Sequence, residues 1–238
     1  MDPSSFLAWL LFAPLSRRRF LLVPALAVLG AALVWSYARS AFLGTMAGGL
    51  VLVFLARGPR RWAGLATLAT GLGAALLIPP VRAHLYMLFE MKRHVTRLNL
   101  WESSWHGIQA RPLLGFGPGN FRALLDGYQV EGYYETLAHS HNDLLMHGVN
   151  AGIPGILAAL LLLATTCWVF QRALKARPSG AWVLAGALAV QGGITIAGLF
   201  QVYQTDDEVE MLLYFILGCA LAVAGQVPGL KPAGKSGV

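Results

Sequence analysis

The stretch HSHNDLLMHGVNAGIPGILAALLLLATTCWVF, from His139 to Phe170, joins a polar, histidine-rich segment to a long apolar run. From Gly148 to Phe170 this run contains no charged residue, and its length is near the roughly 20 residues that cross the hydrocarbon core of a bilayer. The stretch therefore predicts a membrane-spanning helix whose polar end lies at one surface of the membrane.

The composition places the whole chain among integral membrane proteins. Hydrophobic residues make up 56% of it, charged residues only 12%, and the mean hydropathy is +0.59. We predict an all-α integral membrane protein, a polytopic transmembrane helix bundle with one large external loop that contains an amphipathic helix. The expected spans are Phe20–Trp35, Ala41–Ala56, Ala63–Pro79, Gly148–Phe170, Ala181–Gln201 and Met211–Ala224. A further apolar run, Phe6–Pro14, is too short to cross alone and is either an interfacial segment or the remnant of a preceding span.

The basic residues predict the orientation, because short loops rich in lysine and arginine stay in the cytoplasm. Three such loops are expected inside: Arg17–Arg19, Arg57–Arg61 and Arg172–Arg177. Alternation of the spans then places three segments outside: Arg39, residues 82–147 and residues 202–210. All six histidines and every Asp and Glu except Asp2 fall in these external segments. The net charge of +7 is thus a signal of topology, and no nucleic-acid partner is expected.

This topology predicts five regions along the chain. They are an N-terminal apolar stub with a cytoplasmic basic cluster (1–19), three transmembrane helices (20–79), the large external loop (80–147), three further transmembrane helices (148–226) and a cytoplasmic tail (227–238).

The large external loop is too long for a simple connection, and its apolar pattern predicts order. Over residues 81–108, apolar side chains recur at every third or fourth position, which predicts one amphipathic helix at the membrane surface that ends before Arg111. Three residues spaced by four would line one side of this helix: Arg93, Arg97 and Trp101. The sequence GFGPGNF, residues 115–121, then predicts a tight turn.

The approach to the long apolar run contains a candidate base. Ser140 and Asp143 have the spacing of a capping box, which predicts a helix that begins at His141. The positive end of the helix dipole would disfavour an imidazolium there and keep His141 neutral, able to accept a proton. The alternative is that His141 is simply an interfacial residue. Further on, residues 152–155 (GIPG) predict a break or kink in the same helix.

Three groups are expected to converge on the outer face: Arg39, Arg97 and His141. Two guanidiniums hold a diphosphate through paired, charge-assisted hydrogen bonds, and a neutral histidine takes a proton from an incoming hydroxyl. Together these groups suit glycosyl transfer from a lipid diphosphate. The acidic run 206–208 is expected to cap the fifth span on the same side. The simpler alternatives are snorkelling arginines and a solvated acidic turn.

Four sequence elements resemble, in order, those of the O-antigen ligase and O-antigen polymerase superfamily. The ligase motif H-[N/S/Q]-x9-G-x-x-[G/T/Y] is similar to His141-Asn142 followed by Gly152 and Gly155. The other three elements are R-x-x-x-W at Arg97–Trp101, P-L-x-G-x-G-x-x-x-F at Pro112–Phe121 and a Ser-Arg-rich span end at Arg39–Ala41. The resemblance covers roughly Leu22 to Gly225 and corresponds to the C-terminal, motif-bearing half of the family.

The resemblance implies a metal-independent inverting glycosyltransferase without cofactors in the bacterial inner membrane. It would move a glycan from an undecaprenyl-diphosphate carrier at the periplasmic face, surrounded by membrane lipids. Arg39 and Arg97 would bind the diphosphate, and His141 would activate the acceptor hydroxyl. The further substrate-binding residues that we expect are Arg93, Trp101, Asn142, Gly152, Gly155 and Asp207.

Several alternatives stay open from the sequence. The acceptor is a lipid A-core sugar in ligases and another lipid-linked glycan in polymerases, and variants that glycosylate proteins share the motifs. Family members have more spans than the six expected here, so the chain is expected to lack several N-terminal helices. A transporter is the main rival outside enzymes, although the spans are nearly free of charge. A zinc hydrolase, argued from His139-x-His141-x-Asp143, would need further ligands.

Overall fold

The computed structural model describes residues 22–86, 94–134, 138–176, 178–227 and 230, and these residues form helices and connecting turns, with no strand among them. The helices are α2 (Leu22–Ser36), α3 (Arg39–Leu55), α4 (Pro59–Leu77), α5 (Pro79–Tyr86), α6 (Val95–Ala110), α7 (Phe121–Tyr128), α8 (Asp143–Lys175), α9 (Ala181–Gly198) and α10 (Asp207–Ala224). The prediction of an all-helical chain is confirmed for the described residues.

Each of the six predicted spans coincides with a helix, with ends that differ by a few residues. Among the described residues, α8 and α9 are long and apolar enough to cross a membrane. Two shorter apolar helices, Pro24–Ser36 and Arg39–Leu55, accompany them. These helices support a chain embedded in a membrane, and the six-span topology stays a prediction.

Helix α8 has the surface of a lipid-facing helix. Only 11% of its most apolar window is buried inside the chain, whereas the central helix of a soluble protein would be mostly buried. Its side chains Leu157, Leu161 and Trp168 are 60%, 67% and 57% exposed. Such a run of exposed apolar side chains is stable against lipid and costly against water.

Helices α3 and α9 pack through glycines. A Cβ atom on Gly44 would lie 2.8 Å from the carbonyl oxygen of Gly193, and a Cβ on Gly193 would lie 2.7 Å from that of Gly44. Backbones approach this closely only where both helices present small residues, a packing common between membrane helices. The start of α3, which carries Arg39, is thereby fixed relative to the end of α9.

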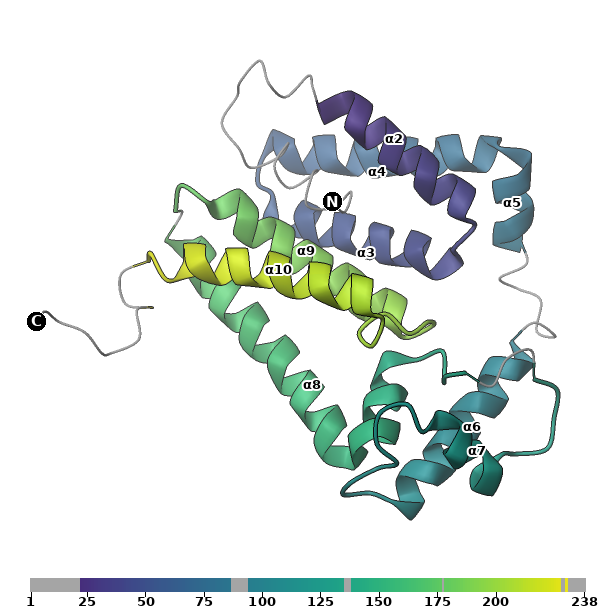
Figure 1. Cartoon of the computed structure of the whole chain (residues 1–238). Coiled ribbons are helices and arrows are strands. Elements are labelled where there is room, and N and C mark those ends of the chain that lie inside the picture. The colour runs from purple at the N-terminus through teal and green to yellow at the C-terminus, as the bar shows by residue number, and fades with distance from the viewer. Residues whose placement is uncertain (1–21, 87–93, 135–137, 177, 228–229, 231–238) are drawn as a thin grey trace, which may run out of the picture.

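The described residues of the 80–147 region have their own hydrophobic core, and for them the prediction of order is confirmed. Helices α6 and α7 pack against the first turns of α8 around a buried cluster of Leu100, Ile108, Phe121, Leu124, Leu125, Met146 and Val149. Helix α6 ends at Ala110, before Arg111 as expected. Figure 1 shows this region at the end of α8 opposite the α8–α9 turn.

The expected surface helix differs from the structure in its extent. The described residues contain two helices, α5 and α6, in place of one, and Arg93 and residues 87–92 lie outside the described residues. Of the expected apolar stripe in α6, Val95, Leu98 and Trp105 are exposed and Ile108 is buried, so contact of this stripe with a membrane surface stays a prediction. The buried face of α6 combines polar and small residues with two large apolar ones: Thr96, Leu100, Ser103, Ser104, Gly107 and Ile108.

Hydrogen bonds explain why α6 buries polar side chains. The backbone N–H of Val130 donates to Ser103 Oγ at 3.0 Å, and Thr96 Oγ1 donates to the Tyr133 carbonyl at 3.3 Å. The chain after α7 is thereby held against α6. A pattern of apolar spacing cannot show such pairs, because their partners lie some thirty residues further along the chain.

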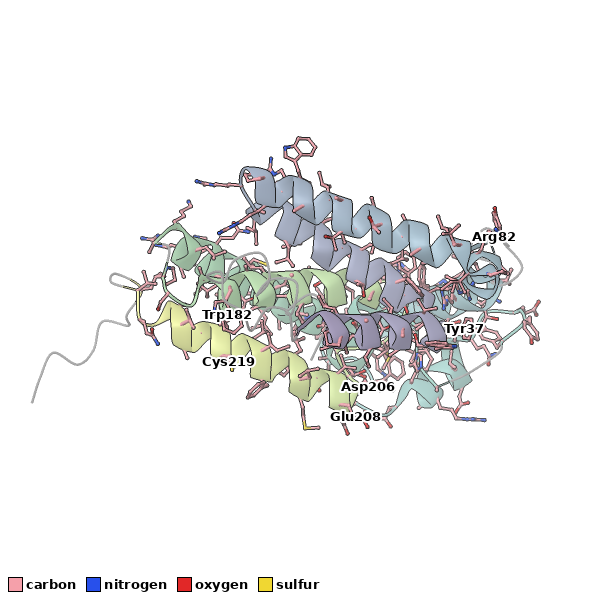
Figure 2. The ribbon with its side chains drawn as sticks, turned by 90° about the horizontal axis from the view of Figure 1, so that it is seen from above. Tyr37, Arg82, Trp182, Asp206, Glu208 and Cys219 are labelled. Atoms are coloured by element: carbon pink, nitrogen blue, oxygen red, sulfur yellow. The ribbon has the colours of Figure 1, made fainter. Side chains whose placement is uncertain are left out.

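The helices place the expected inner and outer loops at opposite ends. In Figure 1, the α3–α4 and α8–α9 turns lie at one end, and the α2–α3 and α9–α10 turns lie at the other, toward α6 and α7. Figure 2 shows Tyr37, Arg82, Asp206 and Glu208 near one end and Trp182 near the other. The loops alternate between the two ends of the helices, and which end lies inside the cell stays a prediction.

Candidate active site at the polar end of α8

Helix α8 begins at Asp143, not at His141 as predicted. Its N-cap is Asn142, whose Oδ1 accepts the backbone N–H of Leu145 at 3.0 Å. The expected capping box between Ser140 and Asp143 is wrong, because Ser140 Oγ donates to the Asn142 carbonyl at 2.8 Å instead. The Asp143 carboxylate is bound by another part of the chain, so Asn142 becomes the cap.

That other part is the α9–α10 turn, residues 199–206. Asp143 is only 3% exposed, and its Oδ1 accepts the backbone N–H groups of Tyr203 at 2.8 Å and Gln204 at 3.0 Å. Asn142 Nδ2 donates to the Leu199 carbonyl at 3.1 Å. The turn is therefore bound at two places to the start of α8.

His141 precedes the helix in a left-handed conformation. Its φ of 53° is uncommon outside glycine and marks a backbone that the surroundings must hold in place. The ring Nδ1 lies 2.7 Å from Oε1 of Gln201, a residue of the α9–α10 turn. Sequence reasoning missed Gln201 and Gln204, and the only signal was their polarity directly after an apolar span.

His139 packs edge-on against His141 and is held neutral. The two ring centroids are 4.2 Å apart, with an interplanar angle of 64°. Burial, and to a lesser extent repulsion by a charge on His141, lowers the pKa of His139 to about 4. The surroundings of His139 therefore disfavour positive charge on its ring at neutral pH.

The third histidine, His147, belongs to α8 itself. Its Nε2 lies 3.2 Å from Oε1 of Gln204. His141 and His147 thus contact two different glutamines of the same α9–α10 turn.

The predicted break in α8 is confirmed at Ala151 and Gly152. Ala151 has φ −140° and ψ 17°, Gly152 has φ 67° and ψ −160°, and Pro154 follows. The break exposes backbone groups that an intact helix would pair internally. The loop after α6 binds them: Ile153 N donates to the Pro112 carbonyl at 2.7 Å, Phe116 N to Val149 at 2.7 Å and Gly117 N to Asn150 at 3.1 Å.

The glycines at this joint have steric roles. A Cβ on Gly152 would collide with the Pro112 carbonyl, and one on Gly115 would collide with the Val149 carbonyl. A Cβ on Gly155 would lie 2.9 Å from that of Ala151. The tight turn expected over residues 115–121 is confirmed by positive φ at Gly115, Gly117 and Gly119. Contact of Gly152 or Gly155 with a substrate stays a prediction.

Arg39 and Arg97 are half-buried residues of two elements that meet this region. Arg39 is the first residue of α3, and the next residue, Ser40, pairs its Oγ with the Tyr203 hydroxyl at 2.9 Å. The α9–α10 turn therefore connects the start of α3 to the start of α8. Arg97 lies in the first turn of α6, the helix whose core includes Met146 and Val149 of α8.

The remaining predicted residues are placed as follows. Trp101 is half-buried one turn after Arg97, and its Nε1 has no hydrogen-bond partner in the part of the chain that the structure describes. Asp207 is exposed at the start of α10. The acidic run therefore opens α10 and does not cap the fifth span, since α9 ends at Gly198; Asp206 is the N-cap and accepts from Val209 N at 3.4 Å.

The donor set of a zinc hydrolase is not assembled in the described residues. No three His, Cys, Asp or Glu side chains among them form a group that could hold a metal ion. Asp143, the third residue of the H-x-H-x-D sequence, directs its Oδ1 to backbone N–H groups.

Part of the chain matches a known protein family. Residues 24–160 match a family model described as O-antigen ligase. The matched range is more than half of the chain, and it includes Arg39, Arg97, His141 and the break in α8. No curated protein matches the chain.

Proposed function

The chain belongs to the O-antigen ligase family, and on this premise we propose that it is a metal-independent inverting glycosyltransferase. The donor is a glycan on an undecaprenyl-diphosphate carrier, and the acceptor is a hydroxyl of a lipid A-core sugar. The reaction takes place at the periplasmic face of the bacterial inner membrane. The family supports a glycosyltransferase-like enzyme and lipid-linked glycan substrates.

The observation that carries this proposal is the placement of His141. It lies at the polar end of the long apolar helix α8, against Gln201, on a turn that also contacts the start of α3. In this position it would take the proton of the acceptor hydroxyl. The hydroxyl oxygen then forms a bond to the anomeric carbon as the bond from that carbon to the diphosphate oxygen breaks.

The two arginines would act on the leaving group. The diphosphate departs with the electron pair of the broken bond, and guanidiniums stabilise that charge through paired hydrogen bonds. Arg39 and Arg97 come from different helices, so they could hold the diphosphate from two sides. We expect Arg93, Trp101, Asn142 and Asp207 to help bind the substrates.

The proposed topology follows the predicted regions. Residues 20–79 and 148–226 contribute three membrane-spanning helices each, residues 80–147 form the periplasmic region, and the ends 1–19 and 227–238 lie inside. The close α3–α9 packing and the exposed apolar surface of α8 support a bundle surrounded by lipid. Both also fit a transporter, but the polar groups described above gather at one end of the helices, which favours surface chemistry.

The glycan profile of a deletion strain tests the function. Loss of polymer attached to lipid A-core, with accumulation of carrier-linked polymer, supports the ligase. Single repeat units on the core would indicate the polymerase of the same family instead. Wild-type protein should restore the profile and His141→Ala should not; a profile unchanged by deletion would contradict both activities.

A further inference from the structure

The hydrogen bonds of Gln201 determine which ring nitrogen of His141 carries the proton. Gln201 Oε1 lies 2.7 Å from His141 Nδ1, and the same oxygen accepts the backbone N–H of Val202 at 3.1 Å. A backbone N–H only donates hydrogen bonds, so the amide atom that faces Val202 must be the oxygen. Turning the amide over would place an NH2 group against this N–H, and two donors would then face each other.

The position of this oxygen determines which ring nitrogen carries the proton. An amide oxygen has no hydrogen to give, so His141 Nδ1 must be the donor of the 2.7 Å hydrogen bond. A neutral imidazole carries a single ring proton. When that proton is on Nδ1, the basic lone pair is on Nε2.

We propose that Gln201 is a positioning residue that fixes His141 in the Nδ1-protonated tautomer, so that Nε2 is the nitrogen that accepts the proton. This inference rests on the proposed role of His141 as the general base. After Nε2 takes the proton of the acceptor hydroxyl, Nδ1–H still donates to Gln201. The same hydrogen bond therefore serves the imidazole and the imidazolium, and no rearrangement accompanies the reaction.

The α9–α10 turn is bound on both sides of Gln201, which holds the glutamine in position. Before it, the Leu199 carbonyl accepts from Asn142; after it, Tyr203 and Gln204 donate to Asp143. Asn142 and Asp143, which make these hydrogen bonds, directly follow His141 in sequence. Gln201 and His141 therefore belong to one hydrogen-bonded unit. The left-handed φ of His141 is a further constraint within it.

Nitrogen NMR of the full chain, labelled at histidine and held in lipid nanodiscs, measures the tautomer directly. We expect His141 to show a protonated Nδ1 and an unprotonated Nε2 at neutral pH. In Gln201→Leu this preference should be lost, and kcat should fall about 10-fold to 100-fold while KM for the donor changes little. Gln204→Leu is the matched control, because it removes the same side chain from the same turn, opposite His147.

Gln201→Glu gives a second and opposite test. A carboxylate keeps an oxygen acceptor opposite His141 Nδ1, so the Nδ1-protonated tautomer should persist. Its negative charge should shift the increase of kcat/KM with pH to higher pH than in the wild-type protein. The neighbouring His139 stays neutral above pH of about 4 and contributes no charge to this shift. This variant also serves if the leucine variant does not fold.

Each outcome separates this inference from the proposed function. A protonated Nε2 in the wild-type protein, or an unchanged tautomer in Gln201→Leu, would overturn the role of Gln201. An unchanged pH profile in Gln201→Glu would contradict it as well. Full activity of His141→Ala would instead overturn the general base, and the NMR result would still decide the tautomer.

Discussion

The backbone N–H of Ile153 donates to the carbonyl of Pro112 across 2.7 Å, and this bond joins the break in α8 to the loop after α6. Two further bonds, from Phe116 and Gly117 to α8 carbonyls, complete the joint. The backbone groups at the break are therefore paired, and these hydrogen bonds hold the start of α8 against the loop between α6 and α7. The two glycine-containing motifs, far apart in sequence, form one structural unit.

The first prediction concerns this joint. Gly152→Ala should lower the free energy of unfolding by at least about 3 kcal/mol, because the strain of a positive φ adds to a collision with the Pro112 carbonyl. Thermal unfolding in detergent measures the loss. Gly119→Ala is the control, since Gly119 has φ 75° with open space around it, and its loss should be about 1 kcal/mol. If both variants lose the same free energy of unfolding, the collision with the Pro112 carbonyl is relieved in Gly152→Ala.

The second prediction separates the histidines. His141→Ala should lower turnover by about 10² to 10⁴ and leave binding of the carrier lipid nearly unchanged, because a general base acts on the acceptor proton. Single-turnover rates and binding of labelled carrier measure the two effects. His139→Ala and His147→Ala should be milder. Equal losses for all three histidines, or loss of donor binding in His141→Ala, would contradict the assignment.

The third prediction concerns the arginines. Arg39→Ala and Arg97→Ala should weaken donor binding and slow transfer together, because the diphosphate is both bound and expelled. Lysine should rescue either poorly, since it lacks the planar fork of the guanidinium. The control is Arg122→Ala, which also removes one positive charge but at an exposed position of α7. Full activity with lysine in place of Arg39 or Arg97 would contradict the proposed roles. An equal loss of activity in the Arg122→Ala control would contradict them as well.

The fourth prediction concerns topology. In a background in which Cys167 and Cys219 are replaced, cysteines near Gly117 and Asp207 should react with an impermeant reagent in spheroplasts. Cysteines at Arg60 and Lys175 should react only after the membrane is opened. Each pair lies at one end of the helices, so the two members should agree. Labelling of the Lys175 position in sealed spheroplasts would refute the proposed orientation.

The fifth prediction concerns pH. The pKa of His139 is about 4 in the folded chain and near 6.5 when unfolded, so the unfolded chain binds more protons between these values. The free energy of unfolding should therefore fall as the pH drops from about 6.5 toward 4. His139→Gln should flatten this dependence, as measured by denaturation of the purified protein at a series of pH values. If His139→Gln leaves the pH dependence of the free energy of unfolding unchanged, other titratable groups cause that dependence.

The sequence by itself determined the features that depend on neighbouring residues. Apolar runs located six helices to within a few residues, and GIPG at 152–155 located the break in α8. The X-Pro step at Arg111-Pro112 located the end of α6. Each of these signals is local. The hydrophobicity of a run, the conformational freedom of glycine and the missing N–H of proline each affect the residues that carry them.

Only the tertiary structure decided which partner each polar group has. Asp143 binds Tyr203 and Gln204, about sixty residues away, so the capping box does not form and Asn142 caps α8. In the same way, Gln201 reaches His141 only because the α9–α10 turn folds back onto the start of α8. A polar side chain has several possible partners of similar strength, and only packing of distant segments decides among them.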